Sequence, residues 1–168
     1  NLSIGGRNLA LNTSSSYSDP FTSFDGGTNK GASITKVLTD GLSVGDTITI
    51  RLIYKYDNIV ATDGQIAQAW TQGDGNVTYW NTGSFFSSAK KTLSGSGEIE
   101  FLYNGIINSE HLKNEYWNTQ IRHEYVASGS VQWKMFKVEK GNRATDWTPA
   151  PEDTNNIIND AIKDLPTI

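Results

Sequence analysis

The stretch TITIRLIYKY, residues 47–56, alternates between two kinds of side chain. One face carries Ile48, Ile50, Leu52 and Tyr54, and the other carries Thr49, Arg51, Ile53 and Lys55. Successive side chains of a β-strand point to opposite faces of a sheet. The stretch therefore predicts a strand that is buried on one face and open to solvent on the other.

Further stretches along the chain have strand character, and the segments between them are rich in Gly, Asn, Asp and Ser. Many short strands with turn-rich connections and little helix indicate an all-β sandwich or barrel. Asn104-Gly105 predicts a tight turn, and the last two strands are expected to form a hairpin. The one helical pattern spans residues 153–165. The other predicted strands are residues 34–38, 64–72, 77–81, 98–104, 118–126 and 131–139.

Composition narrows the possible partners. The 168 residues suit one domain, and the net charge of -4 comes with scattered Lys and Arg, which argues against nucleic acid or an anionic membrane as partner.

The chain has no Cys, so a disulfide framework and a Cys-ligated zinc site are excluded. No apolar run approaches the roughly 18 residues that span a bilayer. The N-terminus lacks the layout of a signal peptide.

The candidate catalytic groups favour a protein that is not an enzyme. His111 and His123 have no ligand spacing with a carboxylate, and the alternation around His123 is typical of a structural histidine. Glu98 and Glu100 share a strand face roughly 7 Å apart, as in a glycosidase pair, but such carboxylates are more often solvated. No nucleophile elbow, phosphate loop or dinucleotide motif is present.

Two motifs lie at opposite ends of the chain. GGRNLALNTS (5–14) and FKVEKGNRATDWTPAPED (136–153) resemble the opening and the closing signature of jelly-roll carbohydrate-binding modules in phage tail, distal-tail and baseplate proteins. The resemblance implies a galactose-binding-like jelly-roll β-sandwich over residues 1–152. Residues 153–168 are then expected to be a helical linker to the rest of a parent protein.

The same resemblance implies a function. Such modules bind bacterial cell-surface polysaccharide of Gram-positive hosts without catalysis, as parts of a multimeric tail assembly of the virion. A structural calcium ion is a family-level possibility, with Asp25 as a candidate ligand because carboxylate and carbonyl oxygens suit this ion. No other cofactor is expected. Two alternatives remain open: a structural spacer or oligomerisation domain of a phage tail, and an accessory module of a secreted glycan-degrading enzyme.

A sugar site needs an aromatic ring for the apolar face of a pyranose, and planar polar groups for its hydroxyls. If the strands at 47–56, 64–72, 118–126 and 131–139 form one sheet, its solvent face carries a suitable set. The expected contacts there are Trp70, Arg122, Gln68, Arg51 and Glu124, with Lys55, Gln120, Gln132 and Lys134 beside them.

Aromatic residues in expected loops form a second group of candidate ligand contacts, comprising Tyr116, Trp117 and Trp80. Trp133 is expected to pack in the core. Near the C-terminus, Pro149 and Pro151 hold the residue before each in an extended conformation. The segment is therefore expected to leave the sandwich as a stiff strap pinned by Trp147, with Asp153 or Thr154 capping the helix.

Overall fold

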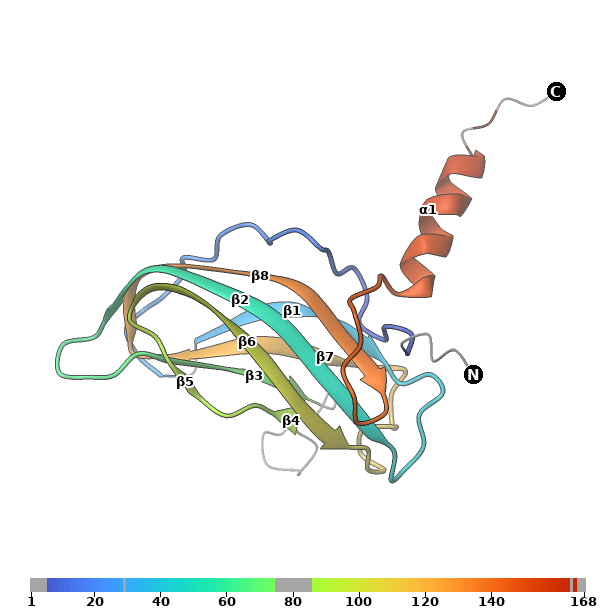
Figure 1. Cartoon of the computed structure of the whole chain (residues 1–168), viewed down its shortest axis with the longest axis horizontal. Helices are drawn as coiled ribbons and strands as arrows, with labels where there is room; N and C mark the ends of the chain where they lie inside the picture. The colour runs from blue at the N-terminus through green and yellow to red at the C-terminus, as the bar shows by residue number, and fades with distance from the viewer. Residues whose placement is uncertain (1–5, 29, 75–85, 164, 166–168) are drawn as a thin grey trace.

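The computed structural model describes residues 6–28, 30–74, 86–163 and 165. Two antiparallel sheets pack face to face, and one helix follows them (Figure 1). The elements are β1 (Lys30–Leu38), β2 (Thr47–Ala61), β3 (Gln68–Asp74), β4 (Phe86–Ser87), β5 (Lys91–Thr92), β6 (Gly95–Ile106), β7 (Tyr116–Glu124), β8 (Val126–Lys140) and α1 (Pro151–Lys163). Sheet A has the order β1-β7-β3-β4, with β5 also paired to β3, and sheet B has the order β6-β2-β8. The predicted jelly-roll β-sandwich with a short C-terminal helix is confirmed.

The core lies between the two sheets. The apolar face of β2, from Ile48 to Tyr54, is almost fully buried, as the alternation predicts. Ala69, Trp117 and Ile121 of sheet A belong to the same buried cluster. Burial of this apolar surface is the main driving force for folding.

The predicted strands are confirmed wherever they fall within the described residues. All but the stretch at 77–81, which lies outside the described residues, match an observed strand, usually a longer one. The predicted tight turn at Asn104-Gly105 is wrong, because both residues lie inside β6. Gly105 serves packing instead, since a side chain there would overlap the ring of Phe86.

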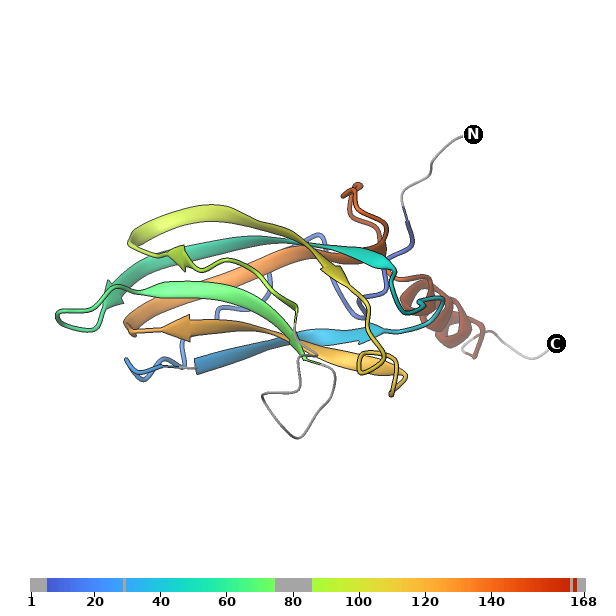
Figure 2. The same ribbon diagram turned by 90° about the horizontal axis from the view of Figure 1, so that it is seen from below.

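The four strands expected in one sheet are divided between two layers (Figure 2). β2 and β8 belong to sheet B, whereas β3 and β7 belong to sheet A. The predicted hairpin of the last two strands is therefore wrong. Tyr125, with a φ of 56°, turns the chain from the end of β7 into β8 in the opposite layer. Strand alternation is a local property and carries no information about which sheet a strand joins.

A β-bulge in β8 explains why apolar residues occur at both odd and even positions of this strand. Lys134 pairs with Ile53, and Lys137 pairs with Arg51, so three steps of β8 match two steps of β2. The extra residue, Met135, has a φ of 55°. The bulge places Trp133 and the buried Phe136 on the same inward face. Trp133 is half-buried and packs against the core cluster without belonging to it, so its expected packing is confirmed at the margin of the core.

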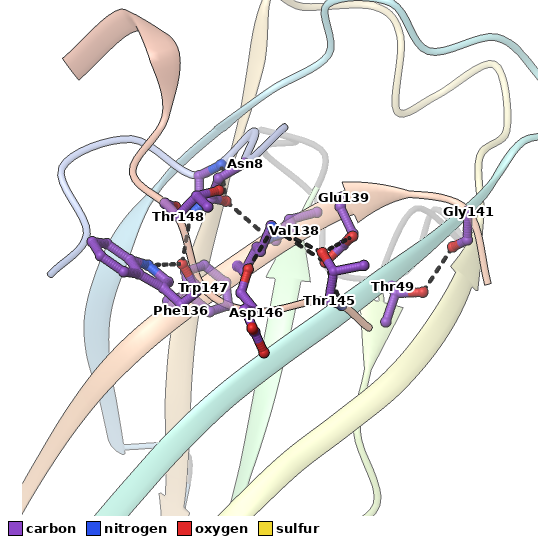
Figure 3. A network of polar contacts seen from close by, with 12 residues as sticks. Asn8, Thr49, Phe136, Val138, Glu139, Gly141, Thr145, Asp146, Trp147 and Thr148 are labelled. Carbon is purple, nitrogen blue, oxygen red and sulfur yellow. Dashed lines mark hydrogen bonds and ion pairs between the residues drawn. The ribbon is translucent and has the colours of Figure 1, made fainter. Parts of the chain in front are cut away.

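The two ends of the domain meet beside β8 (Figure 3). The fully buried Asn8 donates to the carbonyl oxygens of Phe136 and Thr148, both at 2.9 Å, and accepts the N–H groups of Ala10 and Val138, both at 3.0 Å. One carboxamide thus joins the opening segment, the last strand and the exit segment.

Trp147 contributes to the same junction. Its indole Nε1 donates to Thr13 Oγ1 at 3.1 Å and to the Phe136 carbonyl at 3.2 Å, which confirms that it pins the exit segment. The closing loop also covers the buried Lys137, whose ammonium donates to Thr145 Oγ1 at 2.9 Å and to the Asp146 carbonyl at 2.7 Å. The opening and closing sequence signatures therefore contact each other beside β8 and hold the two ends of the domain together.

Helix α1 begins at Pro151, two residues earlier than predicted, and extends away from the sheets (Figure 1). Proline suits the first helical position because the missing N–H has no intrahelical partner there. The Asp153 side chain accepts the Asn12 N–H at 2.7 Å, so it ties the helix to the opening segment instead of capping it. Within the described residues, no helix has the length and apolar character needed to cross a membrane.

Candidate functional site

The outer face of sheet A gathers most of the residues expected to contact a sugar. β3 and β7 pair so that Gln68 lies opposite Glu124 and Trp70 lies opposite Arg122. The residues between them on β3 point inward: Ala69 is in the core, and Thr71 donates to the Tyr103 hydroxyl across the sandwich at 2.8 Å. The alternation therefore places Trp70 and its neighbours on the outer face. We call this surface the sheet A face; it comprises Gln68, Trp70, Gln72, Tyr116, Asn118, Gln120, Arg122 and Glu124.

Trp70 is only 7% exposed although it is absent from the core cluster. The ammonium of Lys90 lies 4.7 Å from the centre of its ring and forms an ion pair of 3.1 Å with Glu124. A half-exposed lysine thus occupies the position over the indole where a sugar ring would stack. A cation–π contact and a surface ion pair each contribute only about 0.5–1 kcal/mol, so a ligand can displace this lysine at small cost.

Arg122 lies beside the indole, next to a glycine on the neighbouring strand. Its Nη1 donates to Gln120 Oε1 at 3.3 Å. Gly31 of β1 pairs with Arg122, and a side chain at this glycine would overlap the Gln120 amide. The missing side chain lets the amide and the guanidinium lie across β1. Both are planar groups of the kind that satisfy paired sugar hydroxyls.

Tyr116 marks the other end of the sheet A face. It is half-buried, and the ammonium of Lys36 lies 4.3 Å from its ring centre. Tyr116 and Arg122 are six residues apart on β7, or about 20 Å along the strand. The exposed Asn118 and the half-buried Gln120 lie between them on the same face. A polar strip with an aromatic ring near each end suits an extended glycan chain more than a single sugar.

Several expected site residues lie elsewhere. Arg51 belongs to the outer face of sheet B, where its guanidinium binds Glu100 at 2.8 Å, because β2 joins the other sheet. Trp117 was expected in a loop but lies in β7 and is 1% exposed. Its ring packs over Gly73, where a side chain would overlap it, and 5.1 Å from the ring of Phe86. A ligand cannot reach it in this structure. Trp80 lies outside the described residues.

The surroundings of Asp25 are occupied by the protein's own hydrogen bonds. Its carboxylate accepts the Gly27 N–H at 2.9 Å, and the Gly26 carbonyl accepts the Thr62 hydroxyl at 2.6 Å. In the part of the chain that the structure describes, no three His, Cys, Asp or Glu side chains are grouped as a metal site.

Neither candidate catalytic group forms a reactive arrangement in the described residues. Glu98 accepts a hydrogen bond from the Tyr17 hydroxyl, and Glu100 is paired with Arg51, both on the exposed face of sheet B. His123 is buried, and its Nδ1 donates to the Lys30 carbonyl at 3.3 Å while its Nε2 accepts the Tyr54 hydroxyl at 3.0 Å. Burial lowers the pKa of His123 to about 4, opposed by the Lys30 carbonyl. Its expected structural role is confirmed.

Some residues of the site were not identified in the sequence. Gln72 lies two residues from Trp70, so alternation along β3 identifies it once the strand is known. Lys90 and Gly31 have no local signal. Their places over the indole and beneath Gln120 depend on pairing between distant strands.

Comparison with known proteins supports the fold. No family model and no curated protein matches the chain. The fold is similar to a solved structure described as the tripod (BppUct-A-L) from the baseplate of bacteriophage Tuc2009, with 13% identity and a TM-score of 0.53. The match covers 89% of this chain and 60% of that chain, so this chain spans less than two thirds of that protein's length. A xylan-binding CBM22-2 domain from Paenibacillus barcinonensis Xyn10C gives 13% identity and a TM-score of 0.40 over 73% of this chain and 91% of that one. The chain thus resembles the baseplate protein in its fold.

Proposed function

We propose that this domain is a non-catalytic carbohydrate-binding module that binds bacterial cell-surface polysaccharide through the sheet A face. The observation that carries the proposal is the register of β3 and β7. It brings the Trp70 indole together with the guanidinium of Arg122 and with the amides of Gln68, Gln72 and Gln120. This combination of a stacking ring and planar polar groups is the chemistry that a pyranose requires.

We further propose that the domain acts outside the cell, in a phage tail that carries many copies of the parent protein. The fold similarity to a baseplate protein supports this location. Single sugar contacts are weak, so micromolar to millimolar affinity is expected for each module. Many copies would raise the effective affinity. Residues 1–152 would form the binding domain, and residues 153–168 would lead to the rest of the tail protein.

The test is binding of the fluorescently labelled chain to intact Gram-positive cells and to their extracted wall polysaccharides. The unsubstituted chain is expected to label at least one strain and to be retarded by its polysaccharide in affinity electrophoresis. Trp70→Ala should abolish both effects, and because truncation of this buried side chain also lowers stability, binding is measured well below the variant's own denaturation midpoint. Failure to bind any strain or polysaccharide of a broad panel would contradict the proposal.

A structural role in a tail assembly is the second candidate, and helix α1 favours it. The helix and the segment just after it expose four large aliphatic side chains, three of them within the helix, with exposures from 51% to 70%. They are Ile157, Ile158, Ile162 and Leu165. Sedimentation of the whole chain distinguishes this candidate. A concentration-dependent oligomer that Ile158→Lys dissociates, without any glycan binding, would support a structural role alone.

A further inference from the structure

The segment before β1 arches away from β8 between two anchor points. The Met135 N–H donates to the Ser14 carbonyl at 2.7 Å, and the Ser18 N–H donates to the Trp133 carbonyl at 2.8 Å. The Ser18 hydroxyl also accepts the Trp133 N–H at 3.0 Å. Between the anchors, β8 advances two residues and the opening segment advances four. Residues 15–17 must therefore stand off the sheet, and we call residues 14–18 the arch.

A hollow of about 170 Å³ lies under the arch, and we call it the arch hollow. A second hollow of about 390 Å³ along β1 shares Asn12, Ile34 and Thr35 with it. Both bordering strands are irregular at this point. β1 loses its register between Ser33 and Lys36, and β8 bulges at Met135. The space therefore results from the backbone paths on both sides.

Two residues that border the arch hollow have left-handed backbones, Asn12 and Met135, each with a φ of 55°. A residue other than glycine at such a φ costs about 1 kcal/mol or more. Such conformations concentrate at ligand sites, where the surrounding structure holds them. Hydrogen bonds hold both residues here, because the Asn12 N–H donates to Asp153 and the Met135 N–H donates to Ser14.

The lining combines apolar and hydroxyl groups. Trp133 and Tyr17 supply aromatic surface, and Ile34 and Phe136 supply aliphatic and further aromatic surface. The polar, uncharged residues of the lining are Asn12, Thr13, Ser14, Ser16, Ser18 and Thr35. The hydroxyls of Thr13, Ser14, Ser18 and Thr35 each form a hydrogen bond within the protein, which holds their oxygens in place. Ligand sites typically have this composition, an apolar surface with a few convergent polar groups.

Tyr17 forms a fixed wall of the arch hollow. Its hydroxyl donates to Glu98, and the ammonium groups of Lys134 and Lys55 lie 4.4 and 5.5 Å from its ring centre. Lys134 is the one charged residue in the lining, and its ammonium already faces the Tyr17 ring. The lining is therefore better suited to a neutral polyol than to a phosphate, which requires a surplus of positive charge.

We propose that the arch hollow is a second glycan site, which binds one neutral sugar unit against Trp133 and Tyr17. This inference rests on the proposed function for its ligand class but not for its location. The arch hollow lies between β8 of sheet B and β1 of sheet A, whereas the sheet A face lies on the outer surface of β3 and β7. Two sites on one module would let it hold a branch or a neighbouring chain of the same polysaccharide.

The test uses the whole chain labelled with 5-fluorotryptophan, which gives one fluorine NMR signal for each of its five Trp residues. Single Trp→Phe variants assign the signals. The probes are D-glucose, D-galactose, L-rhamnose and N-acetyl-D-glucosamine at millimolar concentration, and oligosaccharides released from Gram-positive wall polysaccharide. We expect at least one probe to shift the Trp133 signal. Tyr17→Ala should remove this shift and leave any shift of Trp70, and Tyr17→Phe should keep both because it retains the ring.

The two signals separate this inference from the proposed function. A shift at Trp70 without one at Trp133 would overturn the second site and leave the sheet A face intact. A shift at Trp133 without one at Trp70 would support the second site and contradict the sheet A face. No shift at either residue with any probe would overturn both. A Trp133 shift that persists in Tyr17→Ala would place the binding outside the arch hollow and overturn the inference.

Discussion

The outer faces of the two sheets carry similar residues but differ in how these are used. On sheet B, Arg51 pairs with Glu100, and the closing loop covers Lys137 and Glu139. On sheet A, Arg122 lies beside Trp70 and an amide, and the group over the indole is a half-exposed lysine. Sheet B's outer charges are largely engaged in holding the domain closed. The sheet A face brings together an aromatic ring and planar polar groups, with a half-exposed lysine over the ring.

The largest effect is expected where the ends of the chain close over sheet B. Asn8→Ala removes the partners of two buried N–H groups and two carbonyl groups. We expect the free energy of unfolding to fall by about 4 kcal/mol, because each orphaned buried group costs about 1–3 kcal/mol. Urea denaturation measures the change. A loss below about 1 kcal/mol would mean that water replaces the carboxamide and that the closure is not held by Asn8.

The inner side of sheet A is expected to make stability depend on pH. The folded pKa of His123 is about 4, below the ordinary value of about 6.5, so the folded state takes up its proton later than the unfolded state. The neutral, buried His123 therefore stabilises the folded state fully above pH 6.5. As the pH falls from 6.5 to about 4, the free energy of unfolding is expected to decrease by about 2–3 kcal/mol. Urea denaturation between pH 7 and 4 measures it. His123→Gln should flatten the curve in this window, and an unchanged slope would contradict the assignment.

A smaller effect is expected from filling the space beneath Gln120. Gly31→Val would push the flexible end of the Gln120 amide aside without disturbing the core. We expect affinity for the wall polysaccharide to fall about threefold to tenfold, about 0.6–1.4 kcal/mol, since the hydrogen bond to Arg122 is lost with it. Affinity electrophoresis measures this change. Gly31→Val should cause no further loss of affinity in a Gln120→Ala background. A loss that persists there would show that the valine does not act by displacing the Gln120 amide.

The smallest expected effect is a gain in affinity for the polysaccharide instead of a loss. Lys90→Ala removes the ammonium over the Trp70 ring, and with it the group that a sugar must displace. We expect affinity to rise about twofold, because the contact is worth only about 0.5–1 kcal/mol. Isothermal titration with the wall polysaccharide measures the change. A tenfold loss instead would identify Lys90 as a ligand contact. The matched control, Lys91→Ala, changes the neighbouring exposed lysine and should have no effect.

Sequence alternation predicted the strands and, within β7 and β3, which residues share the outer face. Gln68, Trp70, Arg122 and Glu124 were grouped correctly because they lie on neighbouring strands that keep a regular register. Arg51 was grouped with them because sheet membership depends on pairing between distant strands, which no local pattern encodes. The polar residues around Trp117 made it resemble a loop residue, whereas Gly73 on the next strand makes room for its ring in the core. Residues of the two end signatures contact each other and close the sandwich.

The comparison of the two faces is tested most directly by a matched pair of arginine variants. Arg122→Ala and Arg51→Ala remove the same side chain from the sheet A face and from the outer face of sheet B. Isothermal titration with the wall polysaccharide that the unsubstituted chain binds is expected to show at least a tenfold loss for Arg122→Ala, about 1.4 kcal/mol, and less than a twofold change for Arg51→Ala. Equal losses, or a larger loss for Arg51→Ala, would contradict the assignment of the site to sheet A.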